Sequence, residues 1–280
     1  MVIMWFVEAL KAMFIGVVQG ITEWLPVSST GHMILFDEFL NLGGSEDFKE
    51  MFMVVIQLGS ILAVAVLYFH KLNPFAASKT SAEKRSTLTL WLKVAVGAIP
   101  AAVIGLILDD WIDEHFFNFL VVAIALIVYG IAFILIERFK NKSHFKRETV
   151  DELTFNDAFK IGCFQVLSLI PGTSRSGSTI LGGMLSGVSR VAAAEFSFFM
   201  AIPIMLGASC LKILKFFLDG NILSGNEILI LSIGIIVAFL VSLAAIKFLM
   251  EFVKRHSFES FGWYRIVLGI TIVIYYFVTK

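Results

Sequence analysis

The chain is a series of long apolar runs separated by short polar connections. Crossing the hydrocarbon layer of a membrane takes about 20 residues of helix. Six apolar runs approach or reach this length, at 51–69, 90–108, 117–136, 196–217, 227–248 and 264–278. Two further apolar segments, 1–40 and 155–190, are interrupted near the middle by polar residues. Apolar arms of about 10 to 14 residues are more typical of re-entrant than of spanning helices. The pattern therefore predicts six spans and two broken segments.

Charge along the connections predicts how these segments are oriented. The connections at 70–93, 137–160 and 250–265 are rich in Lys and Arg, which favours the cytoplasmic side. Segment 1–40 must then start and end outside, and segment 155–190 must start and end inside. Each half is one re-entrant helical hairpin plus three transmembrane helices, and because three is odd the second half is inverted. We expect an all-α polytopic membrane protein in a single domain, 1–280, with repeats at 1–140 and 150–280.

The break in the first segment collects polar side chains. Gln19 and Glu23 are four residues apart and share one face of a helix. Pro26 cannot continue that helix, because it lacks an N–H group and clashes with the preceding turn. Three hydroxyl residues suited to cap a second helix, and a histidine, follow it: Ser28, Ser29, Thr30 and His32. The stretch predicts a helix, a break and a second helix.

The second broken segment repeats this plan with the opposite charge. Gly16-x-x-Gln19 recurs as Gly162-x-x-Gln165, and a proline with hydroxyl residues again follows. The polar residues of this second break are Thr173, Ser174, Arg175, Ser176 and Gly177, after Pro171. One half of the chain thus supplies a carboxylate and the other a guanidinium, and inverted repeats bring such broken helices together near the midplane.

The chemistry of the two breaks points to a phosphate ligand. Helix N-termini present unpaired N–H groups to anions, and the planar fork of Arg175 matches phosphate oxygens. Gln19 and Glu23 could hold a hard divalent cation completed by substrate phosphates. Ser29, like its neighbours, could act as a nucleophile if a base activates it, and His32 could attack or protonate instead. The alternatives are a purely structural Glu23–Arg175 ion pair and hydroxyls that only cap helices.

Composition agrees with a membrane protein. Hydrophobic residues make up 58% of the 280 residues and charged residues 16%, against about 45–50% and 25% in soluble domains. The formal net charge of +0 gives no reason to expect a nucleic-acid partner. The two cysteines show no metal spacing.

The motifs resemble the two signatures of the bacterial undecaprenyl pyrophosphate phosphatases, the bacitracin-resistance family. These are Gln19-x-x-x-Glu23 with Pro26-Val27-Ser28-Ser29-Thr30-Gly31-His32, and Pro171-Gly172-x-Ser174-Arg175-Ser176-Gly177. The likeness extends over essentially the whole chain. It implies a multi-pass enzyme of the bacterial plasma membrane, with its site open to the outer face. Its substrate would be a long-chain C55 isoprenyl pyrophosphate lipid, whose terminal phosphate it removes so that the carrier returns to cell-wall synthesis.

The resemblance also implies roles for residues. Glu23, Ser29, His32 and Arg175 would be catalytic, and Gln19 and Glu23 would hold Mg²⁺ or Ca²⁺. The substrate-binding residues would be Ser28, Thr30, Thr173, Ser174, Ser176 and Gly177. Many family members carry Glu at the position of Gln19, and an amide cannot serve as a base, which favours Glu23 as the essential carboxylate.

Three questions stay open at this stage. The attacking group could be Ser29 or His32. An inverted-repeat transporter or lipid flippase would have the same topology. The sequence also leaves open whether the protein forms a homodimer.

Overall fold

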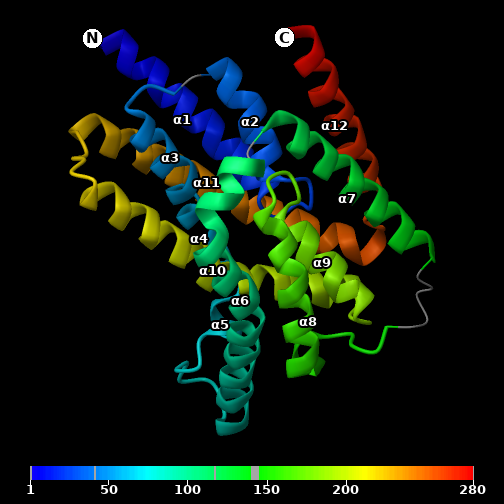
Figure 1. Cartoon of the computed structure of the whole chain (residues 1–280). Helices are drawn as coiled ribbons and strands as arrows, with labels where there is room; N and C mark the ends of the chain where they lie inside the picture. The colour runs from blue at the N-terminus through cyan, green and yellow to red at the C-terminus, as the bar shows by residue number, and fades with distance from the viewer. Residues whose placement is uncertain (1, 41, 117, 140–144, 280) are drawn as a thin grey trace.

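The protein is seen here in a computed structural model, which describes residues 2–40, 42–116, 118–139 and 145–279 (Figure 1). All the regular secondary structure in these ranges is helical. The first half contains α1 (Val2–Thr22), α2 (Ser29–Leu40), α3 (Glu46–Val55), α4 (Gln57–Leu67), α5 (Phe69–Leu72), α6 (Ser81–Phe116) and α7 (Phe119–Phe139). The second contains η2 (Val150–Glu152), α8 (Phe155–Val166), η3 (Leu167–Leu169), α9 (Arg175–Leu185), α10 (Arg190–Leu218), α11 (Gly225–Arg255) and α12 (Glu259–Thr279). No strand forms within these ranges, so the all-α prediction is confirmed.

Seven helical stretches in the described part of the chain are long and apolar enough to cross a membrane. Six of them contain the predicted spans or most of their length, and the protein is therefore a multi-pass membrane protein. Residue 117, where one predicted span begins, and residues 140–144 of the second basic connection lie outside the described ranges. The helices extend beyond the predicted ends because polar end residues continue the helix past the apolar run.

The seventh stretch, Trp5–Thr22, corrects one expectation. We expected the first broken segment to have two short arms, but α1 has 21 residues and is long enough to span. Its two charged residues do not interrupt the helix. Lys11 Nζ pairs with Glu8 Oε1 at 2.7 Å, and Glu8 Oε2 accepts the backbone N–H of Gly43 at 2.6 Å. Both carboxylate oxygens of Glu8 thus have hydrogen-bond partners within the protein.

Both broken segments fold as helical hairpins whose breaks meet near the middle of the molecule (Figure 1). In that view α1 descends from the N-terminus and α2 turns back up, whereas α8 rises from below and α9 turns back down. The Oγ of Ser176, from α9, donates a hydrogen bond to the backbone oxygen of Glu23 at 3.1 Å. The inverted-repeat relation, with its bounds at 1–140 and 150–280, stays a prediction.

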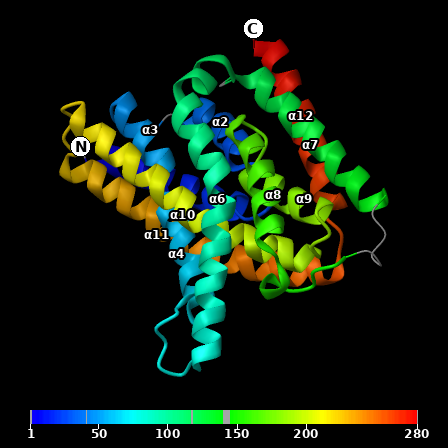
Figure 2. The same cartoon turned by 60° about the horizontal axis from the view of Figure 1, so that its bottom comes forward.

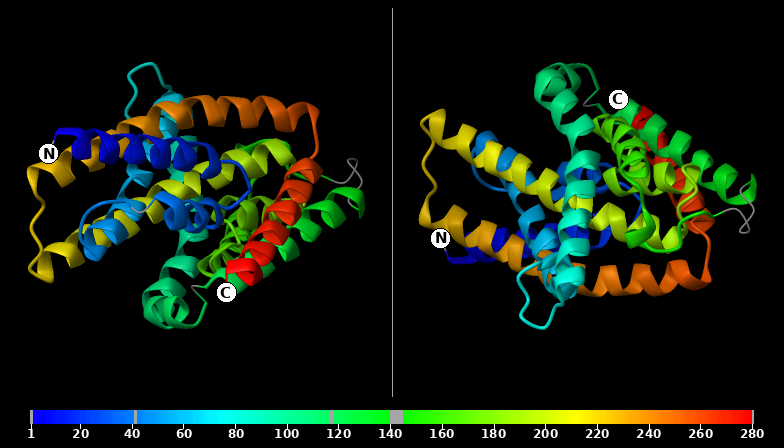
Figure 3. Two further views of the ribbon diagram at one scale, coloured as in Figure 1. Left: turned by 90° about the horizontal axis from the view of Figure 1, so that it is seen from above. Right: turned by 90° about the horizontal axis from the view of Figure 1, so that it is seen from below.

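Long helices pack in pairs around the two breaks. α12 lies along α7 and α1 lies along α11 (Figure 3). α6 crosses the bundle, and its N-terminal end projects beyond it together with the connection after α5 (Figure 2). Large apolar side chains point outward, for example Ile107 and Leu218, which are 73% and 76% exposed. Such a surface is expected for helices that face lipid rather than water.

Glycines let the helices approach one another at these contacts. A Cβ atom on Gly162 of α8 would lie 2.2 Å from the backbone oxygen of Gly97 in α6, and one on Gly59 of α4 would lie 2.1 Å from that of Ile235 in α11. Lipid tails are as apolar as the side chains, so helices in a membrane associate through close packing of this kind. In the first hairpin, a Cβ atom on Gly16 of α1 would lie 2.8 Å from the backbone oxygen of Gly234 in α11, so glycine contacts hold both hairpins in the bundle.

We predict that Gly162→Ala destabilises the protein, because the added methyl group forces α6 and α8 apart. Overpacking costs about 1–3 kcal/mol. The measurement is thermal unfolding of the purified protein in detergent. The matched control is Gly207→Ala in α10, where a Cβ atom meets nothing within 4 Å. Equal unfolding temperatures for the two variants would contradict the prediction.

Candidate active site

The two breaks bring the predicted acid and base into direct contact. Arg175, the first residue of α9, donates from Nη2 to Oε1 of Glu23, which follows α1, at 2.8 Å. The Glu23 side chain is buried and that of Arg175 is largely buried, with exposures of 7% and 12%. The two residues are 152 positions apart in the sequence. The opposed hairpins thus bring the two residues to one place, and their direct ion pair is the contact that the structural alternative describes.

The second carboxylate oxygen of Glu23 is held by the first break. Oε2 accepts hydrogen bonds from the Gln19 amide at 2.9 Å and from the Ser29 hydroxyl at 3.2 Å. Gln19 reaches Glu23 because residues four apart lie above one another on a helix, as predicted. The carboxylate therefore joins α1, α2 and α9, and the hydroxyl of Ser29 points at a base.

Both breaks use the same strained cap. Ser28 and Ser174 have φ values of 72° and 74°, and they are the only non-glycine residues with positive φ in the described part of the chain. The Oγ atom of each accepts the backbone N–H of the glycine three residues on, Gly31 at 3.2 Å and Gly177 at 3.1 Å. Non-glycine residues in such backbone conformations cost about 1–3 kcal/mol each and cluster at functional sites. The shared geometry aims two helix N-termini into the same region.

The remaining predicted binding residues also line the breaks. Ser174 Oγ lies 3.2 Å from Ser176 Oγ. The Ser176 hydroxyl donates its proton to backbone oxygens of the first break. Thr173 is buried directly before the second cap, and Thr30 lies in the first turn of α2. The substrate-binding roles of these residues stay predictions.

His32 is turned toward its own helix and α12. Its Nδ1 lies 2.7 Å from the backbone oxygen of Ser28, and its Nε2 lies 2.7 Å from the hydroxyl of Tyr264. Since a carbonyl oxygen only accepts, Nδ1 carries the proton and Nε2 accepts from Tyr264. Both ring nitrogens are thus engaged, whereas the Ser29 hydroxyl is bound to a carboxylate.

Arg175 has donor capacity left over. Its Nη1 donates to the backbone oxygen of Ser197 at 2.8 Å, and its guanidinium lies 5.6 Å from the ring centre of Trp24. The Nε of Arg175 and the Nε1 of Trp24 are buried and have no hydrogen-bond partner among the described residues. Buried donors normally have a partner. An anionic ligand beside Arg175 would supply one.

The Gln165 amide is also buried without a partner among the described residues. The recurrence of Gly16-x-x-Gln19 as Gly162-x-x-Gln165 was the sequence signal for this residue.

Two oxygen donors are available for a divalent cation. Within the described ranges no group of three or more His, Cys, Asp or Glu residues could hold a metal. Gln19 and Glu23 lie within 2.9 Å of each other, and a half-turn of the amide would present its oxygen beside the carboxylate. Mg²⁺ is often held by one or two carboxylates with substrate phosphates. The pair fits a cation that a diphosphate completes.

Sequence reasoning misplaced one residue of this region. We counted Arg265 with the cytoplasmic basic connection 250–265, but it lies within α12 and is 0% exposed. Its guanidinium donates to the backbone of both breaks, at Pro26, Gly172 and Thr173. Assigning Arg265 to the connection was wrong. In the sequence, a charged residue near the end of an apolar run gives no sign of whether it faces solvent or a neighbouring loop. Tyr264, the partner of His32, was also missed.

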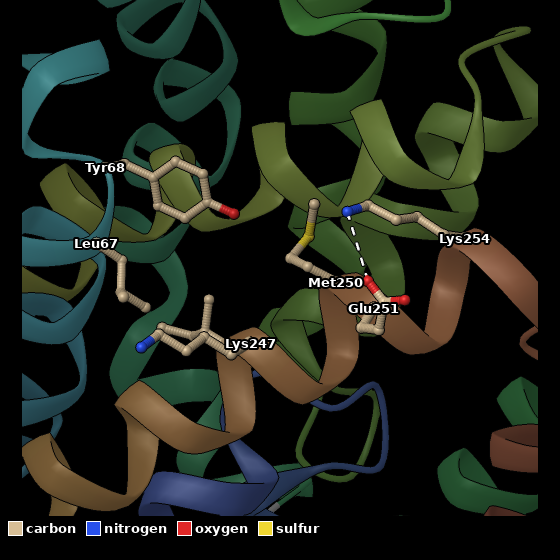
Figure 4. Close-up of a pocket in the computed structure, with 7 residues that line it drawn as sticks. Leu67, Tyr68, Lys247, Met250, Glu251 and Lys254 are labelled. Carbon is tan, nitrogen blue, oxygen red and sulfur yellow. Dashed lines mark ion pairs between the residues drawn. The ribbon is translucent and has the colours of Figure 1, made fainter.

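A separate pocket of about 290 Å³ lies between the end of α4 and the C-terminal part of α11 (Figure 4). Its lining residues are Leu67, Tyr68, Ile246, Lys247, Met250, Glu251 and Lys254. None of them belongs to either break. The chemistry-bearing residues therefore lie elsewhere, around Glu23 and Arg175.

Comparison with known proteins gives one family. The family model described as Bacitracin resistance protein BacA matches residues 12–271. A protein of Limosilactobacillus fermentum is 55% identical over 96% of this chain and 98% of its own length. Proteins of Enterococcus faecalis and Lactococcus lactis subsp. lactis are 56% and 57% identical, over 98% and 96% of this chain and 99% and 97% of their own. Each of the three is named undecaprenyl-diphosphatase.

We predict that Glu23 and Arg175 are strongly coupled in stability. Removing one partner of a buried ion pair leaves an uncompensated charge and costs about 3–5 kcal/mol. Glu23→Ala and Arg175→Ala should each lower the unfolding temperature in detergent. The double variant should lose clearly less stability than the sum of the two. Additive losses would show that the two charges do not meet.

Proposed function

The chain belongs to the bacitracin resistance protein BacA family, and we infer that it is an undecaprenyl-diphosphatase. It hydrolyses undecaprenyl pyrophosphate to the monophosphate and inorganic phosphate in the membrane. The product is the lipid carrier that cell-wall synthesis reuses, and the family name links this recycling to bacitracin resistance. The observation that carries the inference is the buried Glu23–Arg175 pair at the meeting point of two helix N-termini. Such termini bind phosphate.

The diphosphate head would bind between the two breaks. Arg175 has an unpartnered buried Nε among the described residues, and a guanidinium fork suits phosphate oxygens. The hydroxyls of Thr30, Thr173 and Ser174 would complete the donors around it. The C55 tail would remain in the lipid. We place the protein in the bacterial plasma membrane with the site open to the outer face, since the basic connections favour the cytoplasm.

Ser29 is the nucleophile that this geometry favours over His32. Glu23 Oε2 takes the proton as Ser29 Oγ attacks the terminal phosphorus, and the bond from phosphorus to the bridging oxygen breaks. The proton then passes from Glu23 to the departing lipid phosphate. In the second step a water attacks the phosphoserine, Glu23 accepts its proton, and Ser29 regains a proton as inorganic phosphate leaves. Arg175 stabilises charge on the transferring group in both steps.

Gln19 and Glu23 would hold a divalent cation, Mg²⁺ or Ca²⁺, together with the substrate phosphates. When bound, such an ion neutralises charge that develops on the phosphoryl oxygens. The protein contributes one carboxylate and one amide, so the affinity would depend on the diphosphate. This agrees with a single essential carboxylate, Glu23, which serves as the base.

We predict that Glu23→Gln lowers phosphate release from a long-chain prenyl pyrophosphate by about a hundredfold or more, because general-base catalysis contributes 10²–10⁴-fold. The assay uses purified protein in detergent with Mg²⁺. Glu195→Gln is the matched control, since Glu195 also forms an ion pair, at 2.9 Å, but with Lys71 of α5 and not with a residue of either break. Near-normal turnover of Glu23→Gln would refute the site. A wild-type protein that releases no phosphate but moves lipid between leaflets would be a flippase instead.

We predict that Ser29→Ala loses more turnover than Ser28→Ala. Ser28 mainly caps α2, so its loss should lower the unfolding temperature, whereas Ser29 forms the bond to phosphorus. Quenching the reaction with labelled substrate should trap a phosphoryl group on Ser29, identified by peptide mapping. A phosphoryl group on His32, or equal turnover of the two serine variants, would exclude Ser29 as the nucleophile.

A further inference from the structure

Two adjacent polar residues of α12 contact the hairpins from outside. Tyr264 binds His32 of α2, and Arg265 binds the backbone of both breaks. Arg265 is 0% exposed, and none of its hydrogen bonds in the described structure goes to a carboxylate. An arginine inside a membrane helix is costly and marks function by default. The proposed catalytic steps use neither residue.

The guanidinium of Arg265 joins the two breaks through backbone carbonyls. Nη1 donates to the oxygen of Pro26 at 3.1 Å in the first break. Nη2 donates to the oxygens of Gly172 and Thr173, both at 2.9 Å, in the second break. Backbone groups freed at a break within a membrane need partners inside the protein. One planar side chain supplies them to both breaks and thereby sets the distance between them.

Tyr264 fixes the ring of His32. The two rings are stacked, with centroids 5.7 Å apart and planes inclined by 6°. The Tyr264 hydroxyl donates to Nε2, which keeps the proton of His32 on Nδ1, facing the Ser28 carbonyl. The tautomer of a histidine is set by the hydrogen bonds that its nitrogens make. α12 therefore orients the side chain of His32 in α2 through Tyr264 and the backbone of both breaks through Arg265.

We propose that Tyr264 and Arg265 are positioning residues for the reaction of the two breaks. Arg265 sets the approach of Pro26 to Gly172 and Thr173, and so the meeting of Glu23 with Arg175. Tyr264 sets the tautomer of His32, so that the Nδ1–H of His32 holds the backbone oxygen of Ser28, the residue directly before the nucleophile Ser29. The proposal rests on the proposed function, because its importance lies in how well the reacting groups are aligned. Misplacement by about 1 Å can cost a hundredfold in rate.

The first experiment compares Arg265→Lys with Arg265→Met in the phosphate-release assay. Lysine keeps the charge but not the fork that reaches three carbonyls. We expect kcat to fall about tenfold for Arg265→Lys and a hundredfold or more for Arg265→Met, with KM nearly unchanged. Arg190→Lys is the matched control, since Arg190 is a largely buried arginine paired with Glu137, away from the breaks. It should lose stability but keep kcat. If Arg265→Lys also keeps kcat while losing stability, Arg265 is only structural.

The second experiment removes one oxygen atom with Tyr264→Phe. We expect kcat to fall about tenfold with unchanged unfolding temperature, and its pH profile to shift. The ¹⁵N-histidine NMR signals should show that His32 no longer holds a single tautomer. Tyr276→Phe, twelve residues or about 18 Å further along the same helix, should change none of these. An unchanged tautomer and pH profile in Tyr264→Phe would overturn the role of Tyr264.

The two inferences can fail separately. If the wild-type protein releases no phosphate from a prenyl pyrophosphate, the proposed function fails. The NMR comparison of Tyr264→Phe with wild type still decides whether Tyr264 orients His32, because it needs no turnover. If the wild-type protein is active and the α12 variants keep full kcat, the positioning proposal alone fails.

Discussion

The buried ion pair between Glu23 and Arg175 is the interaction on which the rest of the structure depends. A single charge inside a membrane protein is costly, and the cost falls only when an opposite charge and further hydrogen bonds surround it. Here the guanidinium contacts one carboxylate oxygen at 2.8 Å, and Gln19 and Ser29 occupy the other. The pair can form only if two helices stop in the interior at the same place.

Stopping two helices in a membrane creates a second requirement, because each break frees backbone groups that have no water to bind. The structure meets it in the same way on both sides. Ser28 and Ser174 turn back with positive φ to cap the following helices. Arg265 then takes up carbonyls from both breaks at once. The side chains that bind the backbone of the breaks therefore also position the two breaks that carry Glu23 and Arg175.

The hairpins stay in place because their neighbours come unusually close. Glycines at α6–α8 and α1–α11 allow backbone contacts that a larger residue would prevent. α12 is held against α7 and carries Tyr264 and Arg265 to the breaks. The precise placement of a few polar atoms thus rests on apolar packing across most of the bundle, which is the usual support that a preorganised site requires.

Much of this protein follows from its local pattern. Apolar runs of sufficient length predict six spans, Pro26 and Pro171 predict two breaks, and the i,i+4 spacing places Gln19 beside Glu23. Charge alternation also predicts that the two hairpins enter from opposite faces, which brings their breaks, with Glu23 and Arg175, to one region. The role of Arg265, the partner of His32 and the full length of α1 needed the folded chain. Residue period and hydropathy describe how one segment sits in its surroundings, but hydrogen bonds such as those of Tyr264 and Arg265 join positions more than ninety residues apart. Which distant carbonyl or ring a side chain meets is set by helix packing.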